Sequence, residues 1–415
     1  MKIIKFSTFF AATVAILLLI PRTGSTHEPI TTKVMFNKDV IRILEQNCLG
    51  CHALGKIKAD IPLTTYEEAR PWAKAIKEEV LEKRMMPYQA VRGYGSFEHD
   101  YTLPQRDVEL LISWIEGGAP RGDAKDYPSE KIRKLINGKE WKLGEPDLVL
   151  QPEAESKITG EDAGVVRCLS IPTGLKEDRF ISGLDFQPGN GAIVHSATFS
   201  VGSKPDKQSC QSNLPSFAQW VPGQSAMRLP AGAGRLLPAG SNIVIKILYQ
   251  TNGEPATDRS RLGLYFAKST INKSIHNIAI APSSATSIPA NESGFRVSAI
   301  HRVSEPVEVI AIRPILFPLA KSIEATAVRP DGTVEVLIWA RNYRFDWQPS
   351  YYFKKPVALP KGTRIEVTAY LDNSDENPNN PHDPPTQMQL KDALCEIALT
   401  STMPARGAPL RQARR

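Results

Sequence analysis

The sequence lacks the features that mark several large classes of protein. Five of its 415 residues are cysteine, too few for a scaffold built on disulfides. The longest apolar run, residues 6–20, has 15 residues, fewer than the ~20 that a membrane-spanning helix needs. Apolar residues make up 41% and charged residues 23%, which is typical of a globular protein with two or three domains.

The body of the chain also lacks an excess of charge of either sign. The formal net charge is +7, from 51 basic and 44 acidic residues. Without the seven basic residues at the two ends, the remainder is balanced at 44 against 44, so the sequence predicts no nucleic-acid partner. Those seven residues are Lys2, Lys5, Arg22, Arg406, Arg411, Arg414 and Arg415.

The first 25 residues have the pattern of an export signal. Lys2 and Lys5 precede the apolar run, Pro21 ends it, and residues 23–25 are small enough for a signal peptidase. We therefore expect residues 1–25 to be a signal peptide and the protein to be exported to the periplasm or envelope of a bacterium. After its cleavage no membrane span is expected; retention of the leader as an anchor is the alternative.

Two of the cysteines lie in the segment Cys48-Leu49-Gly50-Cys51-His52. This C-x-x-C-H spacing is typical of c-type haem attachment, because two thiols on one turn reach both vinyl groups of a porphyrin. The adjacent imidazole then lies beneath the iron. Zinc would need a second ligand pair nearby, and none follows. The sequence predicts one haem c, held covalently by Cys48 and Cys51, with His52 as proximal iron ligand.

A haem that carries electrons usually has a second axial ligand, and two methionines are candidates. Met85 and Met86 lie just before Pro87, at the end of a stretch (66–84) with helical apolar spacing. A thioether in a loop that leaves a helix can turn toward the iron, and such ligation raises the reduction potential. A last amphipathic helix is expected over 107–116.

Three further segments accompany this site: 63–71 (LTTYEEARP), 86–88 (MPY) and 114–120 (WIEGGAP). With the C-x-x-C-H stretch, they make residues 33–122 resemble the small class I-like cytochrome c domains that are fused to larger modules in many environmental bacteria. The resemblance implies a small all-α domain. It also favours Met86 as the distal haem ligand, with Met85 as the alternative.

Residues 165–400 show little helical periodicity and many short β-type runs. Runs at 243–249, 334–339 and 364–370 are rich in branched and aromatic residues, and turn sequences such as 329–332 separate them. This pattern predicts antiparallel β-sandwiches. A length of about 240 residues favours two of them in tandem.

This region has several recognisable signposts: 177–179 (EDR), 186–190 (FQPGN), 220–223 (WVPG), 249–253 (YQTNG) and 359–363 (LPKGT). Together they resemble the copper type II ascorbate-dependent monooxygenases, which include the peptidylglycine hydroxylating enzymes. The resemblance implies two jelly-roll-like sandwiches, each of which holds one copper in that family.

Most of that family's copper ligands are missing from this chain. At the first site only His195 survives, because the position of a third histidine falls in 246–249 (KILY). At the second site the histidines are replaced within 314–317 (PILF), and the late methionine falls at Leu394, with Met388 close by. Apolar side chains offer no lone pair to copper. We therefore expect no copper, a packed or hydrogen-bonded His195, and hydrophobic core in place of the former sites.

The other three cysteines have simpler interpretations. Cys168 and Cys210 flank the first metal strand and can form a disulfide in an oxidising compartment. Cys395 is expected to be a buried small apolar residue.

The predicted organisation is a signal peptide (1–25), a cytochrome c domain (33–122), a linker (123–145), two β-sandwiches (146–285 and 286–402) and a basic tail (403–415).

The expected function is that of an exported c-type cytochrome that transfers single electrons to and from redox partner proteins of the cell envelope. The sandwich pair would then serve docking or structure, in a larger envelope assembly or alone, without catalysis of its own. The alternative is a copper- and haem-dependent monooxygenase that hydroxylates an organic substrate.

Overall fold

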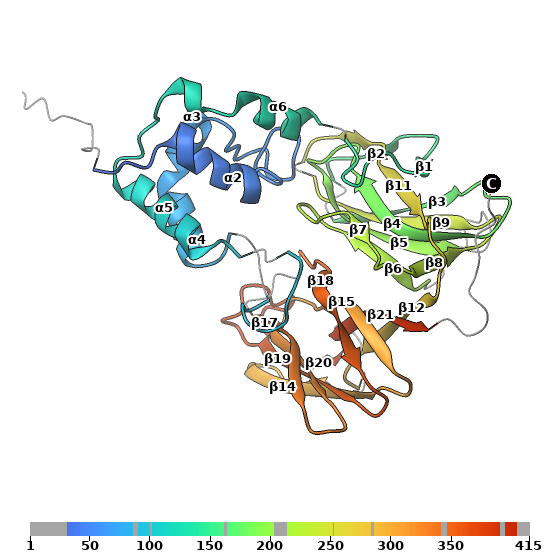
Figure 1. The fold of residues 1–415 in the computed structure, drawn as a ribbon. Helices are drawn as coiled ribbons and strands as arrows, with labels where there is room; N and C mark the ends of the chain where they lie inside the picture. The colour runs from blue at the N-terminus through green and yellow to red at the C-terminus, as the bar shows by residue number, and fades with distance from the viewer. Residues whose placement is uncertain are drawn as a thin grey trace, which may run out of the picture.

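The chain is mostly β-sheet in a computed structural model (Figure 1). Strands make up 41% and helices 15%, and the strands form several sheets, so the predicted β-rich region is confirmed. The structure describes residues 31–85, 90–99, 102–138, 140–161, 164–202, 214–251, 253–283, 286–341, 347–390 and 395–404.

Helices gather in the N-terminal third, which we call the helical unit (residues 31–138). None of its described helices is both long and apolar enough to cross a membrane. In chain order they are η1 (Phe36–Val40), α2 (Ile41–Asn47), α3 (Tyr66–Ala69), η2 (Arg70–Trp72), α4 (Ala73–Leu81), α5 (Gln105–Glu116), η3 (Ala124–Asp126) and α6 (Ser129–Asn137).

The helix predicted over 66–84 is present but interrupted. Pro71 lies in the 3₁₀ turn η2 between α3 and α4, because proline has no N–H with which to continue the helical bonds. The helix predicted over 107–116 is confirmed as α5, which begins two residues earlier, at Gln105.

An aromatic cluster joins η1, α3 and α5 of the helical unit. Phe36 and Trp114 are fully buried, and their ring centroids lie 5.9 Å apart. The ring of Tyr66 meets Phe36 edge-on at 5.7 Å. These contacts pack η1 against α5 and α3, and tilted or edge-on pairs of this kind add stability beyond their buried area.

The segment expected as a linker, 123–145, is more ordered than its charge suggested. It contains η3 and α6, and Ile132 of α6 is 3% exposed within the core of the helical unit. Leu135 and Ile136 pack against the same core, so the segment holds an amphipathic helix whose exposed face carries the charges.

The strands form two sandwiches, each with a hydrophobic core of its own. We name them the first and second sandwich in chain order. The strands of the first are β1 (Leu148–Leu150), β2 (Ser156–Ile158), β3 (Val165–Pro172), β4 (Arg179–Gln187), β5 (Val194–Gly202), β6 (Ser216–Trp220), β7 (Met227–Arg228), β8 (Ala233–Leu237), β9 (Asn242–Tyr249), β10 (Ala256–Asp258) and β11 (Arg261–Phe266).

The second sandwich contains the remaining strands. They are β12 (Lys273–Ile280), β13 (Ser287–Ile288), β14 (Glu292–Arg302), β15 (Val307–Ile315), β16 (Ala320–Val328), β17 (Val334–Arg341), β18 (Tyr351–Leu359), β19 (Arg364–Asn373), β20 (Met388–Gln389) and β21 (Glu396–Pro404).

One long sheet runs through both sandwiches. Its order is β1-β11-β4-β8-β12-β21-β15-β18, and β7 also pairs with β4. The pairs are antiparallel except for β8 and β12, which are parallel at Ala233 and Lys273. The order of the other first-sandwich sheet is β3-β9-β5-β6, and that of the second is β14-β19-β16-β17. β12 therefore lies in the second sandwich's sheet, upstream of the boundary expected at 285/286.

Each of the three predicted strand runs falls within one strand of the structure. The runs at 243–249, 334–339 and 364–370 fall in β9, β17 and β19. The turn at 329–332 is closed by a bond from Gly332 N–H to the Arg329 carbonyl, 3.0 Å long, and Gly332 has the positive φ of +85° that suits glycine.

A buried carboxylate joins the strands of the first sandwich to its β4–β5 turn. Asp258 is 2% exposed and accepts a hydrogen bond from the Tyr249 hydroxyl at 2.8 Å. It also accepts one from the Asn190 N–H of the turn at 2.8 Å and one from the Ser260 hydroxyl at 2.8 Å. Burial, followed by the neighbouring Asp258 charge, raises the pKa of Tyr249, so the hydroxyl stays a donor.

Replacing Tyr249 by phenylalanine should lower the free energy of unfolding by about 1–3 kcal/mol, because the buried Asp258 loses one of its donors. Urea denaturation measures this. The matched control is Tyr370→Phe, whose side chain is 44% exposed on β19 and which should change little. Equal losses in the two variants would contradict the role given to the buried pair.

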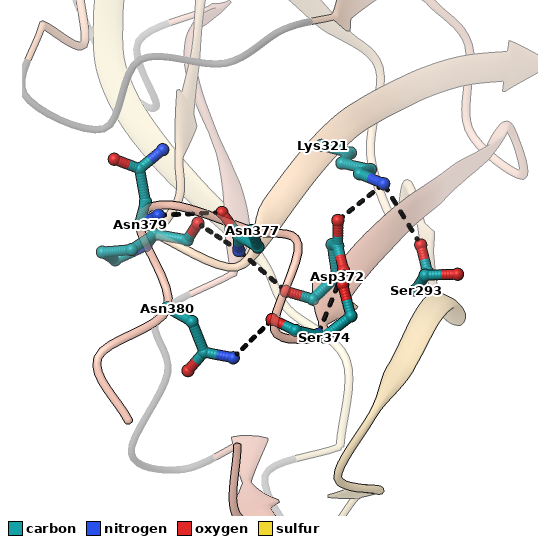
Figure 2. Close-up of polar contacts among 8 residues, drawn as sticks. Ser293, Lys321, Asp372, Ser374, Asn377, Asn379 and Asn380 are labelled. Atoms are coloured by element: carbon teal, nitrogen blue, oxygen red, sulfur yellow. Dashed lines mark hydrogen bonds and ion pairs between the residues drawn. The ribbon is translucent and has the colours of Figure 1, made fainter. Parts of the chain in front are cut away.

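A second buried carboxylate, Asp372, organises the loop that follows β19 (Figure 2). It is 4% exposed, and the Lys321 ammonium donates to it at 2.6 Å. The hydroxyl of Ser374 also donates to it, at 2.6 Å. Burial alone would raise the pKa of Asp372, but the donors Lys321 and Ser374 outweigh it and hold the pKa below its usual value.

The depressed pKa makes Asp372 a source of acid sensitivity. Its stabilising contribution is complete above the unfolded-chain pKa of about 3.9 and is lost as the pH falls through the lower folded pKa. Asp372→Asn should therefore flatten the loss of stability below about pH 4. Denaturation series at several pH values test this, with Asp375→Asn, an exposed neighbour, as control. A wild-type slope in the Asp372 variant would exclude the carboxylate as its source.

Candidate functional site

The segment 48–52 forms a tight turn at the end of α2. The Cys48 N–H bonds to the Leu44 carbonyl at 2.7 Å, which continues the helix. The N–H groups of Cys51 and His52 both bond to the Cys48 carbonyl, at 3.0 and 2.9 Å. Residues three apart on such a turn are neighbours. The turn therefore brings together Cys48 and Cys51, which are both free thiols and half-buried.

Two apolar residues fix the direction of this turn. Leu49 and Ala53 are both fully buried in the core of the helical unit. Cys48 packs against the same core, so the turn is held there on both sides of Gly50. Burial raises the pKa of Cys48 to about 12, with a smaller contribution from Cys51, and also raises the pKa of Cys51.

His52 is 8% exposed and has a defined tautomer. Its Nδ1 lies 2.9 Å from the Ile61 carbonyl oxygen, which can only accept, so Nδ1 carries the hydrogen. Burial lowers the pKa of His52, which favours the neutral ring. The lone pair of that ring is then on Nε2, the atom that a metal would take, and a carbonyl on the opposite nitrogen is the usual support of a ligating histidine.

A capping box supports the far end of the same loop. The Leu63 N–H bonds to the His52 carbonyl at 3.0 Å. Glu68 then accepts from the N–H groups of Thr64 and Thr65 at 2.8 and 3.0 Å, and the Thr65 hydroxyl accepts from the Glu68 N–H at 3.2 Å. This reciprocal cap starts α3 and fixes the loop on which His52 depends.

The segments that carried the cytochrome resemblance meet in space. The Tyr66 hydroxyl donates to the Ala119 carbonyl at 3.0 Å, and the Trp114 indole N–H donates to the Pro120 carbonyl at 3.0 Å. Segments 63–71 and 114–120 therefore close over the same core as the 48–52 turn.

The two candidate distal methionines differ in what the structure gives. Met85 is half-buried, and its N–H bonds to the Glu79 carbonyl of α4 at 3.1 Å. Met86 lies outside the described residues. The main chain at Met85 is thus still hydrogen-bonded to α4.

The first sandwich approaches the 48–52 turn closely, which the sequence did not reveal. A Cβ on Gly191 would lie 2.8 Å from the Gly55 carbonyl oxygen, and one on Gly50 would lie 3.7 Å from the Gly223 Cα. The Lys142 ammonium, from the segment after α6, donates to the Gln224 carbonyl at 2.8 Å. Gly223 lies in the motif 220–223 and Gly191 follows the motif 186–190, but the sequence did not show their partner.

His195 lies in β5 at a β-bulge and is 8% exposed. Leu316 is 3% exposed in the core of the second sandwich, and Phe317 packs against that core. Met388 lies in β20 against the same core, and Leu394 lies outside the described residues. Within the described residues, no three His, Cys, Asp or Glu side chains gather as a metal site would require.

The structure describes two of the three remaining cysteines, Cys168 and Cys395. Cys168 in β3 is disulfide-bonded, whereas its predicted partner Cys210 lies outside the described residues. Cys395 is a free thiol, 3% exposed in the core of the second sandwich, as expected.

Comparison with known proteins gives no family. No family of known proteins matches the chain, and no curated protein matches it. The major capsid protein P2 of bacteriophage PM2 is similar over 63% of this chain and 99% of its own, at 8% identity and a TM-score of 0.28. N-glycanase F is similar over 63% and 98%, at 9% identity and 0.27. PNGF-II is similar over 72% and 70%, at 7% identity and 0.26. Likeness this weak carries no functional argument.

Glu68→Ala should lower the free energy of unfolding by about 1–2 kcal/mol, because it removes the acceptor of the capping box. Glu67→Ala is the matched control, since Glu67 is 61% exposed and makes a surface ion pair with Arg121. Thermal and urea unfolding of both variants measure the difference. An equally small change in the two would show that the cap does not hold the loop.

Proposed function

We propose that this protein is an exported c-type cytochrome that transfers single electrons through one haem attached to Cys48 and Cys51. The observation that carries the proposal is the tautomer of His52. Its Nδ1–H is held by the Ile61 carbonyl, so Nε2 offers a lone pair from the same turn that presents two free thiols. Export is inferred from the leader pattern of residues 1–25.

The roles of the residues follow from their chemistry. Cys48 and Cys51 would hold the haem through thioether bonds to its two vinyl groups, each formed by addition of the S–H with no net oxidation. His52 would be one protein ligand of the iron, and Met86, or Met85 as the alternative, would be the other. The bound haem supplies the one-electron iron couple. The thioether ligand favours the reduced state.

The sandwich pair is proposed as a docking or structural module that resembles the copper monooxygenases without their copper ligands. Apolar packing of Leu316 supports this, because a leucine in the core has no lone pair to offer a metal. The close approach of Gly191 to the Gly55 carbonyl, where a Cβ would not fit, supports a structural role for the first sandwich at the site. The proposed partners are redox proteins of the cell envelope.

Metal analysis of purified full-length protein, matured in a host that attaches haem c, tests the proposal. We expect one iron per chain and no retained copper after copper loading and dialysis. Tightly held copper would instead favour the alternative, a monooxygenase that hydroxylates an organic substrate with copper and haem.

The attachment residues have a matched control in the same chain. The double variant Cys48→Ala and Cys51→Ala should lose all haem that survives denaturing electrophoresis, because thioether bonds alone persist there. Cys395→Ala, at a buried free thiol elsewhere, should keep it. Haem staining of the gel measures both. Retention of covalent haem in the double variant would exclude the proposed attachment.

A further inference from the structure

Segment 90–98 of the helical unit, between α4 and α5, pairs with the second sandwich. Figure 1 shows this stretch beside β17 and β18, far from them in sequence. Two isolated β-bridges attach it, Ala90 with Ala340 and Phe97 with Phe353. One short stretch of chain therefore reaches both strands.

On the β18 side, main-chain hydrogen bonds run in both directions. The Glu98 N–H donates to the Tyr352 carbonyl at 2.8 Å, and the Lys354 N–H donates to the Ser96 carbonyl at 2.8 Å. This is the pattern of an added strand, two residues of which exchange bonds with the strand beside them.

On the β17 side, one main-chain bond and one ring contact hold the segment. The Val91 N–H bonds to the Trp339 carbonyl at 2.7 Å. The Tyr94 ring meets the Trp339 ring edge-on, with 4.9 Å between the centroids. Aromatic pairs at this distance add specificity to backbone pairing.

Side chains of the segment also take part in the core of the second sandwich. Ala90 and Phe97 are partly buried against that core. The Phe97 ring lies 5.1 Å from Tyr351 and 5.1 Å from Phe353, measured between centroids. The segment is therefore seated on the second sandwich by apolar packing as well as by hydrogen bonds.

The two strands that it covers are both sheet edges. β17 is the last strand in the order β14-β19-β16-β17, and β18 is the last strand of the long sheet. An edge strand presents unpaired N–H and C=O groups, and these accept an added strand from another chain. Segment 90–98 occupies such positions on both edges.

Beyond the segment, β18 carries protection of its own. Pro356 has no N–H to offer an added strand. The Ala358 carbonyl accepts from the Arg329 guanidinium at 3.3 Å. Lys354 and Lys355 are exposed, and lysine on an edge opposes pairing with other chains.

β17 has a different composition. Residues 334–340 (VEVLIWA) are rich in branched and aromatic residues, with one charge and no proline or glycine. Segments of this kind pair readily with identical segments. Antiparallel pairing across a two-fold axis joins identical strands, so a second copy of β17 is a matching partner for this edge.

We propose that segment 90–98 is a cover that keeps the second sandwich from pairing with a second copy of this chain. While the segment is seated, its backbone occupies positions that an added strand would take. When it is displaced, β17 pairs antiparallel with β17 of the second copy. The proposal rests on these contacts and is independent of the haem.

Two glycines of the segment allow a matched experiment. Gly95 has φ +83°, and a Cβ there would lie 2.5 Å from the Leu337 carbonyl oxygen of β17. Gly93 has φ +90°, but a Cβ there would meet nothing within 4 Å. Alanine therefore strains the backbone at both positions and strikes the second sandwich only at Gly95.

Hydrogen exchange in purified full-length protein measures whether the segment is seated. The amides to follow are those of Val91 and Lys354, because both donate across the contact. Gly95→Ala should speed their exchange roughly tenfold or more, since exchange follows local opening. Gly93→Ala should keep both close to the wild-type rate.

Sedimentation velocity over a series of concentrations measures the pairing itself. Wild type and Gly93→Ala should sediment as monomers, whereas Gly95→Ala should form a dimer whose fraction rises with concentration. Adding Val334→Lys to Gly95→Ala should restore the monomer. Val334 is 60% exposed on β17, so the lysine leaves the core intact and puts a charge on the edge.

A second pair of variants protects the test against misfolding. If Gly95→Ala yields no folded protein by circular dichroism, Tyr94→Ala takes its place, because Tyr94 is 39% exposed and its ring meets Trp339. Tyr370→Ala, 44% exposed on β19, is its control. Faster exchange and a dimer are expected in Tyr94→Ala alone.

Four results would contradict the proposal. Faster exchange in Gly95→Ala without self-association would show that the opened edge does not select a second copy. A dimer that persists with Val334→Lys would exclude β17 as the pairing surface. A wild type that dimerises as strongly as Gly95→Ala would show that the seated segment is no cover. Equal exchange in the two glycine variants would show that Gly95 does not seat it.

Discussion

Backbone pairing across the borders of the structural units is the constraint on which the architecture depends. β8 of the first sandwich pairs with β12 of the second, and segment 90–98 of the helical unit bridges to the edge strands β17 and β18. An edge left open would leave peptide groups unpaired and available to other chains. The helical unit therefore supplies part of the cover for the edges of the second sandwich.

The helical unit meets both sandwiches. The 48–52 turn and the loop after it lie against the first sandwich at Gly223 and Gly191, and segment 90–98 bridges to the second sandwich. The turn that carries Gly191 is held by the bond from Asn190 to the buried Asp258. A buried network inside the first sandwich thus sets the surface against which the proposed haem turn rests.

Much of the local structure could be predicted because its causes are local. The C-x-x-C-H spacing fits one turn, α5 follows its apolar period, and β9, β17 and β19 follow runs of branched residues. The charged stretch 123–145 was expected to be a linker, and its charges gave little sign of α6, whose Ile132, Leu135 and Ile136 pack against the core of the helical unit.

The sequence by itself determined which residues offer the chemistry: two thiols, an adjacent imidazole and two methionines, with apolar residues where copper ligands would stand. Only the tertiary structure decided the tautomer of His52, the place of β12 and the pairing of segment 90–98 with β17 and β18. The Ile61 carbonyl lies nine residues from His52 and reaches it only through the fold of the loop, and the partners of segment 90–98 lie about 250 residues away. The physical reason is that each depends on a carbonyl or a sheet edge that no local periodicity brings into place.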